Sequence, residues 1–209
     1  ILINEIKDGY LIKGNQKYSP RNLAIEGDYS QAAFFFVANA IGNSVQIDNL
    51  FNESLQGDKK VIEILKEIGY NNNNSLDCFN IDATNIPDLV PILAVLGSFC
   101  NGTSRIFGAS RLKIKESDRL LAISSVLNSI GGKITPTDDG LIIKPINEFI
   151  GGITDSFGDH RIVMSLAIAA TRSIKPIIIQ NADAVNKSYP NFFKDYINLG
   201  GIADVINVE

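Results

Sequence analysis

An internal repeat constrains this chain more than any other feature, because each copy must adopt the same local structure. Three segments share one layout: an acidic residue, an apolar helical run, a turn and a β-rich run. The acidic residues are Asp28, Asp88 and Asp159, which lie 60 and 71 residues apart. The apolar runs are Ala32–Ile41, Leu89–Cys100 and Ile162–Ala170, and the β-rich runs that follow them are Val45–Ile47, Thr103–Phe107 and Ile177–Ile179.

Each copy continues with an amphipathic helix that is followed by glycine. These helices are expected to start at Asp58, Asp118 and Pro190, and the glycines after them are Gly69, Gly131-Gly132 and Gly200-Gly201. Glycine in this place is typical of a helix C-terminus. The sequence therefore predicts an α/β fold of three βαβαββ units or a close permutation, one of which can be completed by residues outside this chain.

A pseudo-threefold axis would place corresponding helix starts of the three units at one end of the domain. Positive helix ends and charged side chains would then converge there and form a site for a multiply anionic small molecule. For Asp28 and Asp58 we expect N-capping rather than catalysis.

The densest charge cluster, Arg111–Arg119, holds four cations and two carboxylates directly ahead of the apolar helical run Leu120–Ile130. Alternating polar and apolar residues over Arg111–Lys115 predict an extended segment, and Ser117 or Asp118 can cap the helix. The spacing alone fits either an anion site at a helix start or a solvated, charged helix end.

Composition excludes several classes of function. The net charge of −4 argues against nucleic-acid binding, which usually shows a basic excess. Cys78, Cys100 and the single His160 cannot make a standard zinc site or a disulfide framework, so we expect reduced thiols and no metal. No apolar run approaches the roughly 18 residues of a membrane span, and no signal peptide opens the chain, which favours a cytoplasmic protein.

Residues 1–26 alternate weakly around Tyr10–Ile12 and Leu23–Ile25 and predict two strands that belong to, or link from, a preceding domain. The start at Ile1 rather than Met suggests a fragment. Residues 27–209 would then form the domain of three units. The Asn-rich segment Tyr70–Asn74 is expected to lie in a loop tip without function.

Six short motifs in this order resemble those of one known family: Gly27-Asp-Tyr-Ser-Gln-Ala-Ala33, Gln56-Gly-Asp58, Ile86-Pro-Asp88, Lys115-Glu-Ser-Asp-Arg119, Asp159-His-Arg161 and Lys187-Ser-Tyr-Pro190. The family is the 3-phosphoshikimate 1-carboxyvinyltransferases, or EPSP synthases. The resemblance covers nearly the whole chain but only the C-terminal half of the family's usual length. It implies an inverse α/β barrel domain of an enzyme with two domains and an active site in the cleft between them.

The resemblance also implies the reaction. The enolpyruvyl group of phosphoenolpyruvate passes to the 5-hydroxyl of shikimate 3-phosphate through a tetrahedral intermediate, with release of phosphate and without metal or organic cofactor. Asp88 becomes the candidate base, Glu116 the candidate proton donor, and Lys115 a ligand near the 5-hydroxyl. The same resemblance gives a set of residues that hold phosphoenolpyruvate, with a supporting role for the histidine: Arg119, Arg161, Lys187 and His160.

The resemblance further implies that the N-terminal half supplies other cations, so we expect this chain to be folded but essentially inactive alone, and the full-length enzyme to be monomeric. Arg111 stands where some members carry another polar residue. The alternatives are the related enolpyruvyl transferase that acts on UDP-N-acetylglucosamine, and a non-catalytic anion-binding or RNA-terminus-processing domain. The Lys-Glu-Ser-Asp-Arg string favours the shikimate enzyme, and the low basicity weighs against the second alternative.

Overall fold

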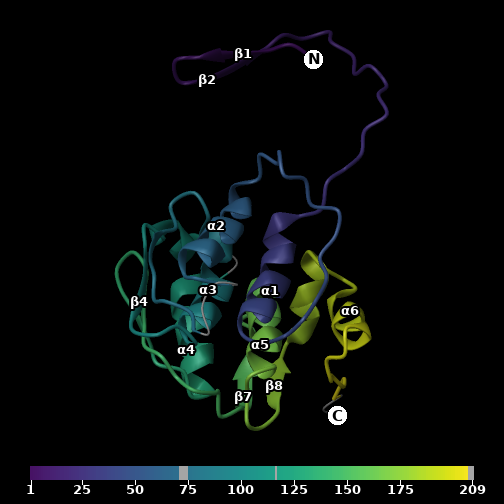
Figure 1. Ribbon diagram of the computed structural model, residues 1–209. Helices are drawn as coiled ribbons and strands as arrows, with labels where there is room; N and C mark the ends of the chain where they lie inside the picture. Colours follow the sequence, from purple (N-terminus) through teal and green to yellow (C-terminus); the bar gives the residue numbers. More distant parts are fainter. Residues whose placement is uncertain (71–74, 116, 207–209) are drawn as a thin grey trace.

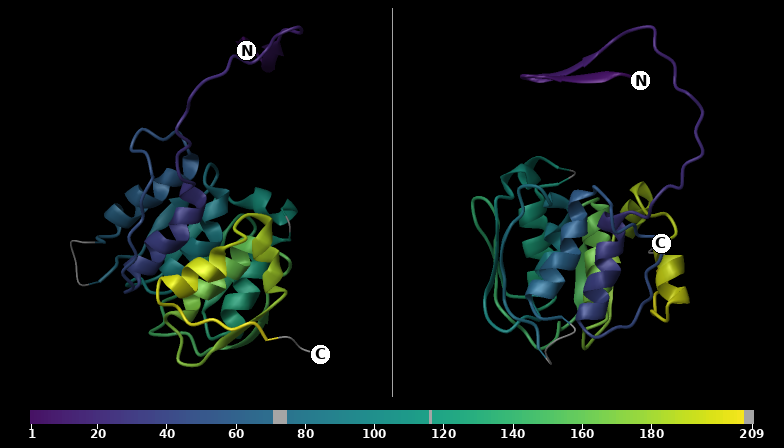
Figure 2. Two further views of the ribbon diagram at one scale, coloured as in Figure 1. Left: turned by 90° about the vertical axis from the view of Figure 1, so that its right-hand side faces the viewer. Right: turned by 45° about the horizontal axis from the view of Figure 1, so that its top comes forward.

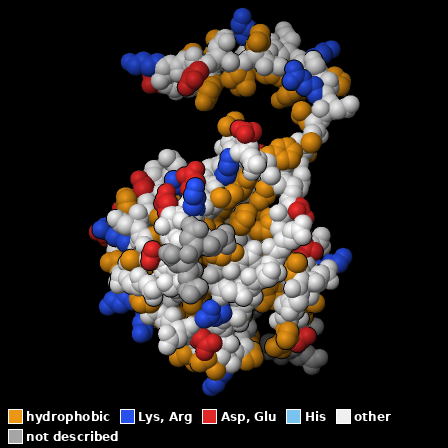
Figure 3. Space-filling view, viewed as in Figure 1, with side chains coloured by type: hydrophobic (Ala, Val, Ile, Leu, Met, Phe, Trp, Pro, Cys, Tyr) orange, Lys and Arg blue, Asp and Glu red, His pale blue; other side chains and the backbone are white. Residues whose placement is uncertain are grey.

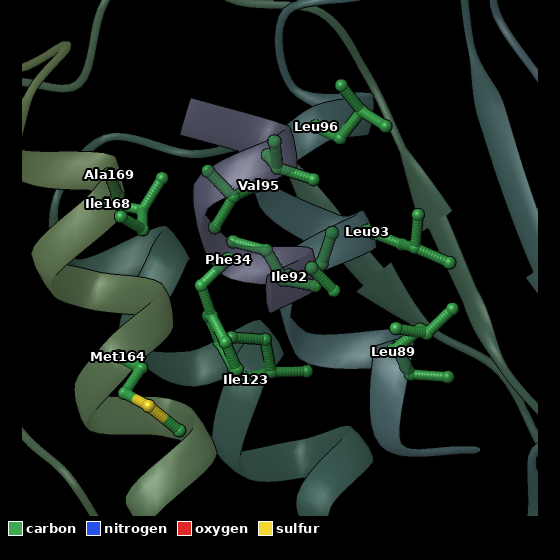
Figure 4. Close-up of a cluster of buried hydrophobic side chains, with 14 of the residues drawn as sticks. Phe34, Leu89, Ile92, Leu93, Val95, Leu96, Ile123, Met164, Ile168 and Ala169 are labelled. Carbon is green, nitrogen blue, oxygen red and sulfur yellow. The ribbon is translucent and has the colours of Figure 1, made fainter. Parts of the chain in front are cut away.

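Three apolar helices form the centre of the computed structural model, which describes residues 1–70, 75–115 and 117–206. They are α1 (Tyr29–Ala40), α3 (Val90–Gly97) and α5 (His160–Ala170), and each packs against the other two. Figure 4 shows Phe34, Ile92 and Met164 among the buried side chains at this junction. All eight residues of α3 are buried, as expected for a helix that is apolar on every face.

A second set of helices surrounds the centre: α2 (Lys60–Glu67), α4 (Arg119–Ser129) and α6 (Phe192–Asn198) (Figure 1). In α2 only one face is buried, which is the pattern of a helix lying on a core. The glycines after these helices, Gly69, Gly131 and Gly200, all have positive φ, so the predicted C-terminal glycines are confirmed.

The second unit has the complete predicted order, β3-α3-β4-α4-β5-β6. Its sheet runs β3-β4-β6-β5, with β3 parallel to β4 and the other pairs antiparallel. The strands are β3 (Asn80–Asp82), β4 (Ser104–Phe107), β5 (Ile134–Pro136) and β6 (Leu141–Ile143). Ile143 reaches Gly97 of α3, where an added Cβ would lie 3.1 Å from the Ile143 side chain. This close packing seats the sheet on the central helix.

The third unit has the order β7-α5-β8-α6, with β7 (Gly152–Asp155) parallel to β8 (Ile177–Gln180). Short 3-10 helices precede or follow the main elements: η1 (Gly57–Lys59), η2 (Pro87–Leu89), η3 (Ser110–Ile114) and η4 (Ala182–Lys187). The predicted β-rich runs in the second and third units are thus confirmed as β4 and β8.

Four details of the sequence prediction are wrong. Val45–Ile47 is not a strand; the Val45 backbone is bonded to the Asn39 side chain instead of to a neighbouring strand. Arg111–Lys115 is not extended but lies mostly in η3, because Leu112 turns into the core while Ile114 stays exposed. The last helix starts at Phe192 instead of Pro190. Asp58 caps no helix with its side chain.

Residues 1–26 form no part of the core. They contain the predicted two strands, β1 (Ile3–Ile6) and β2 (Gly9–Ile12), but the second is not at Leu23–Ile25. The hairpin stands away from the helices at the end of an extended linker (Figures 1 and 2). Figure 3 shows apolar side chains along it and on the upper surface of the body beside the linker. Among the described residues, no helix has the length and apolar character needed to cross a membrane.

Candidate functional site

The starts of α3, α4 and α5 meet in a network of charged side chains centred on Asp88. Asp88 lies in η2, and its carboxylate is 30% exposed. Nη1 of Arg119, the first residue of α4, donates to its Oδ1 at 2.9 Å, and Nη2 of Arg161 in α5 donates to its Oδ2 at 3.0 Å. The predicted convergence of helix starts from different units is therefore confirmed for these elements.

Arg119 is held from its other side by Asp159. Nε of Arg119 donates to Oδ2 of Asp159 at 2.7 Å, and the two side chains are 1% and 0% exposed. The other carboxylate oxygen of Asp159 accepts from the backbone N–H of Arg161 at 2.9 Å and so caps α5. Burial of this pair away from water fixes the guanidinium of Arg119, since each charge depends on the other for solvation.

The sequence identified Asp159 as a repeated acidic residue and as part of the motif Asp159-His-Arg161, but did not predict it as the partner of Arg119. The two residues lie 40 positions apart on different helices, so no spacing pattern could pair them. The signal that was available is the string Asp159-His-Arg161, which places a carboxylate next to a cation at a helix start.

Arg161 has unused hydrogen-bonding capacity. Arg161 is buried, and its Nη2 donates to Asp88. Its Nε and Nη1 have no hydrogen-bond partner in the described part of the chain. A buried guanidinium with two unpaired nitrogens is costly unless an acceptor arrives. The arrangement is thus suited to an anionic ligand, whose oxygens accept from the remaining N–H groups.

The other predicted site residues lie at different distances from this centre. Nζ of Lys115 is 3.9 Å from Oδ1 of Asp88, and Lys115 is partly exposed. His160 is buried at the start of α5, with Nδ1 3.8 Å from Oδ1 of Asp159. Lys187 is exposed at the end of η4, which packs against α5. Glu116 lies outside the described residues, as does Asn71–Asn74, so the predicted proton donor stays a prediction.

Asp58 adds a buried carboxyl near the network. It accepts a hydrogen bond from Oγ of Ser30 in α1 and is 8% exposed. Burial raises the pKa of Asp58; the Ser30 hydrogen bond lowers it, Asp88 raises it further, and Arg161 lowers it. Asp28, by contrast, caps α1 as predicted, since its Oδ1 accepts from the N–H of Ser30 at 2.7 Å.

The described residues contain no cluster of three or more His, Cys, Asp or Glu side chains that could hold a metal ion. What they bring together is Lys115, Arg119 and Arg161 around Asp88 and Asp159. Fold and site together define the class: a domain of repeated βαβαββ units in which converging helix starts bring two arginines and a lysine together.

Comparison with known proteins identifies the family. The family model for EPSP synthase (3-phosphoshikimate 1-carboxyvinyltransferase) matches residues 2–196, and the chain belongs to this family. The 3-phosphoshikimate 1-carboxyvinyltransferase of Clostridium novyi is 48% identical over 205 residues, which cover 93% of this chain and 47% of that protein. That of Clostridioides difficile is 44% identical over 218 residues, covering 99% of this chain and 50% of that protein.

Comparison with solved structures leads to the same family. The EPSP synthase of Acinetobacter baumannii superposes with a TM-score of 0.85 at 27% identity, over 98% of this chain and 53% of that one. The predicted fold class, an inverse α/β barrel domain of repeated units, is confirmed by this likeness. The chain spans about half the length of the curated relatives it matches.

Proposed function

We propose that this chain supplies one half of an active site that transfers the enolpyruvyl group of phosphoenolpyruvate to the 5-hydroxyl of shikimate 3-phosphate. The single observation that carries the proposal is the buried guanidinium of Arg161, which is held by Asp88 through Nη2 while Nε and Nη1 have no partner among the described residues. Membership of the EPSP synthase family supports the choice of substrates.

The chemistry requires one proton to leave the alcohol and one to reach the methylene carbon of phosphoenolpyruvate. Asp88, partly exposed between three cations, is the proposed acceptor of the hydroxyl proton. As the alcohol oxygen attacks the central carbon, Lys115 stabilises the developing charge. Glu116, by resemblance, donates a proton to the methylene carbon. In the elimination that follows, this proton returns to Glu116, and the leaving phosphate takes the proton that Asp88 received from the hydroxyl.

The two arginines and Lys187 are proposed to bind phosphoenolpyruvate. Arg119 is fixed by Asp159 and Asp88, so its side chain does not have to be ordered when phosphoenolpyruvate binds. Arg161 offers its two unpaired nitrogens, and Lys187 adds a positive charge at the end of η4. His160 lies between Asp159 and Arg161 in the sequence. It is proposed to help orient the side chain of Arg161.

A second domain of the same enzyme is part of the proposal. Half a cleft cannot orient two substrates, and orientation supplies a large share of enzymatic rate. The exposed apolar side chains of residues 1–26, such as Leu2, Ile3 and Ile12, are proposed to pack on that domain. Two free cysteines fit the proposed cytoplasmic location, and the complete enzyme is proposed to be a monomer.

The test is a phosphate-release assay on the full-length protein with phosphoenolpyruvate and shikimate 3-phosphate. We expect turnover by the full-length protein and negligible turnover by the 209-residue chain alone. Turnover with UDP-N-acetylglucosamine but not with shikimate 3-phosphate would contradict the proposed acceptor. Near-normal turnover by the chain alone would contradict the shared site.

Arg161→Lys tests the site itself. Lysine keeps the charge but cannot bond Asp88 and a ligand together, so we expect KM for phosphoenolpyruvate to rise about 10- to 100-fold, the loss of a charged hydrogen bond. Arg105→Lys is the matched control, because Arg105 is exposed on β4 and should leave KM unchanged. Equal effects of the two substitutions would remove Arg161 from the site.

A further inference from the structure

Two non-glycine residues adopt left-handed backbone conformations where the strands of the third unit end. Phe157 follows β7 with φ +53°, and Asn181 follows β8 with φ +55° and ψ +37°. Such conformations are uncommon for residues other than glycine and are rarest for bulky residues. They cost free energy that the surroundings must offset. Both loops lead directly into candidate site residues.

Side chains tie the two loops together. Nδ2 of Asn181 donates to Oδ2 of Asp155 at 2.6 Å, and the backbone N–H of Phe157 donates to Oδ1 of Asp155 at 2.5 Å. Oγ of the buried Ser156 donates to the carbonyl of Asn181 at 2.9 Å and accepts from the N–H of Gly158 at 3.2 Å. We call Asp155, Ser156 and Asn181 the strand-end latch.

The two segments that the latch joins lead in the chain to the two cations assigned to one substrate. The first loop continues into Asp159, whose N–H donates to the carbonyl of Ser156 at 3.0 Å, and then into Arg161. The second loop continues into η4, which ends at Lys187 and packs against α5. A change in the latch therefore shifts the starting points of both segments relative to each other.

The other units show which part of the latch is general. Asn49 in the first unit and Gly108 in the second also have positive φ after the corresponding run. In the second unit Asp82 accepts from the backbone and hydroxyl of Thr84, as Asp155 accepts from Phe157. Gly108 has no side chain to reach back, so the fold of a unit does not require the amide–carboxylate bond. That bond is an addition of the third unit.

We propose that Asp155 and Asn181 are positioning residues for phosphoenolpyruvate: their bond fixes the spacing of Arg161 and Lys187, and neither touches the substrate. The proposal rests on the proposed function of this site. It predicts an effect on one substrate, because the latched segments continue in the chain to Arg161 and Lys187, which are proposed to hold phosphoenolpyruvate, and not to Lys115.

Three variants of the full-length protein test it through KM for each substrate and kcat. Asn181→Gly keeps the left-handed conformation and removes only the amide, so KM for phosphoenolpyruvate should rise about 3- to 10-fold. Asn181→Asp sets two carboxylates against each other, and the rise should reach about 10- to 100-fold. The exchange Asp155→Asn with Asn181→Asp restores an amide–carboxylate pair and should return KM to within about threefold of the original.

In all three variants KM for shikimate 3-phosphate and kcat should stay within about threefold. The matched control is Asn49→Gly, an exposed left-handed position in the first unit, which should change neither KM. Unchanged KM for phosphoenolpyruvate in Asn181→Asp, equal changes for both substrates, or no rescue by the exchange would each overturn the positioning role.

Direct calorimetric binding of phosphoenolpyruvate to the same proteins separates this inference from the proposed function. Absence of turnover in the unmodified full-length protein would refute the function. The latch would still be judged by binding: weaker binding by Asn181→Asp with recovery in the exchange supports it, and equal binding by all variants refutes it.

Discussion

Replacement of Asp159 by asparagine is the sharpest test of how this site is held. Asparagine caps helices about as well as aspartate, so the bond from the N–H of Arg161 to position 159 can survive. The bond from Nε of Arg119, now 2.7 Å from Oδ2 of Asp159, loses its charged acceptor or meets an amide donor. The substitution therefore isolates the buried ion pair from the cap.

The expected magnitude follows from burial. Removing one partner of a buried pair costs about 3 to 5 kcal/mol. Because Asp88 still accepts from Nη1 of Arg119, we expect the lower end, about 3 kcal/mol, out of a typical total of about 5 to 15 kcal/mol. With a urea dependence of about 2 to 3 kcal/mol per molar, the unfolding midpoint of the 209-residue chain should fall by about 1 to 1.5 M.

Asp28→Asn provides the matched control. Asp28 also caps a central helix, accepting from the N–H of Ser30 at 2.7 Å, but it is exposed and makes no ion pair within the described part of the chain. Its midpoint should lie within about 0.2 M of the original chain, as for an ordinary surface substitution. If Asp159→Asn behaved like Asp28→Asn in urea, the reasoning that Arg119 depends on Asp159 would be refuted.

Three further predictions concern groups away from the ion pair. Asp58 has a raised pKa, so the folded chain binds its proton more tightly than the unfolded chain and stability falls as pH rises from about 3.8 through the folded pKa; Asp58→Asn should raise the urea midpoint at pH 7 and not at pH 3. Burial raises the pKa of Cys100 to about 12, so a thiol reagent at pH 8 should modify exposed Cys78 quickly and Cys100 only after unfolding. Gly140→Ala would place a Cβ 1.9 Å from the carbonyl of Ile106 and should lower the urea midpoint markedly.

Controls for these three come from exposed positions and from unfolding. Asp8→Asn in the hairpin should give no difference between pH 3 and pH 7, and Gly14→Ala meets no atom within 4 Å and should be neutral. A stabilisation by Asp58→Asn that is equal at both pH values, fast modification of two thiols in the native chain, or a neutral Gly140→Ala would contradict the respective prediction.

The sequence predicted the helices well because their apolar periodicity and terminal signals are local. Asp28 and Asp118 cap α1 and α4, and glycine follows α2, α4 and α6, as the pattern indicated. It failed where structure depends on a neighbour. Val45–Ile47 has the composition of a strand but pairs with no strand in the described part of the chain. Arg111–Lys115 alternates like a strand but folds into a 3-10 helix, because this places Leu112 in the core.

The candidate site shows the same division. Motifs selected Asp88, Arg119 and Arg161, and the structure brings them together. The pairing of Arg119 with Asp159, and the bond of Asp155 with Asn181, join residues 40 and 26 positions apart. Such contacts follow from the packing of units and leave no periodic trace in the chain.

The mutual packing of α1, α3 and α5 has a consequence for synthesis of the chain. Each central helix is apolar and needs the other two for burial, yet 73 residues separate the end of α3 at Gly97 from the end of α5 at Ala170. At about 5 to 20 residues per second, the first two helices leave the ribosome about 4 to 15 s before the third. During that interval the faces that α5 will cover are open to water, and a chaperone that binds apolar helices would meet the nascent chain there.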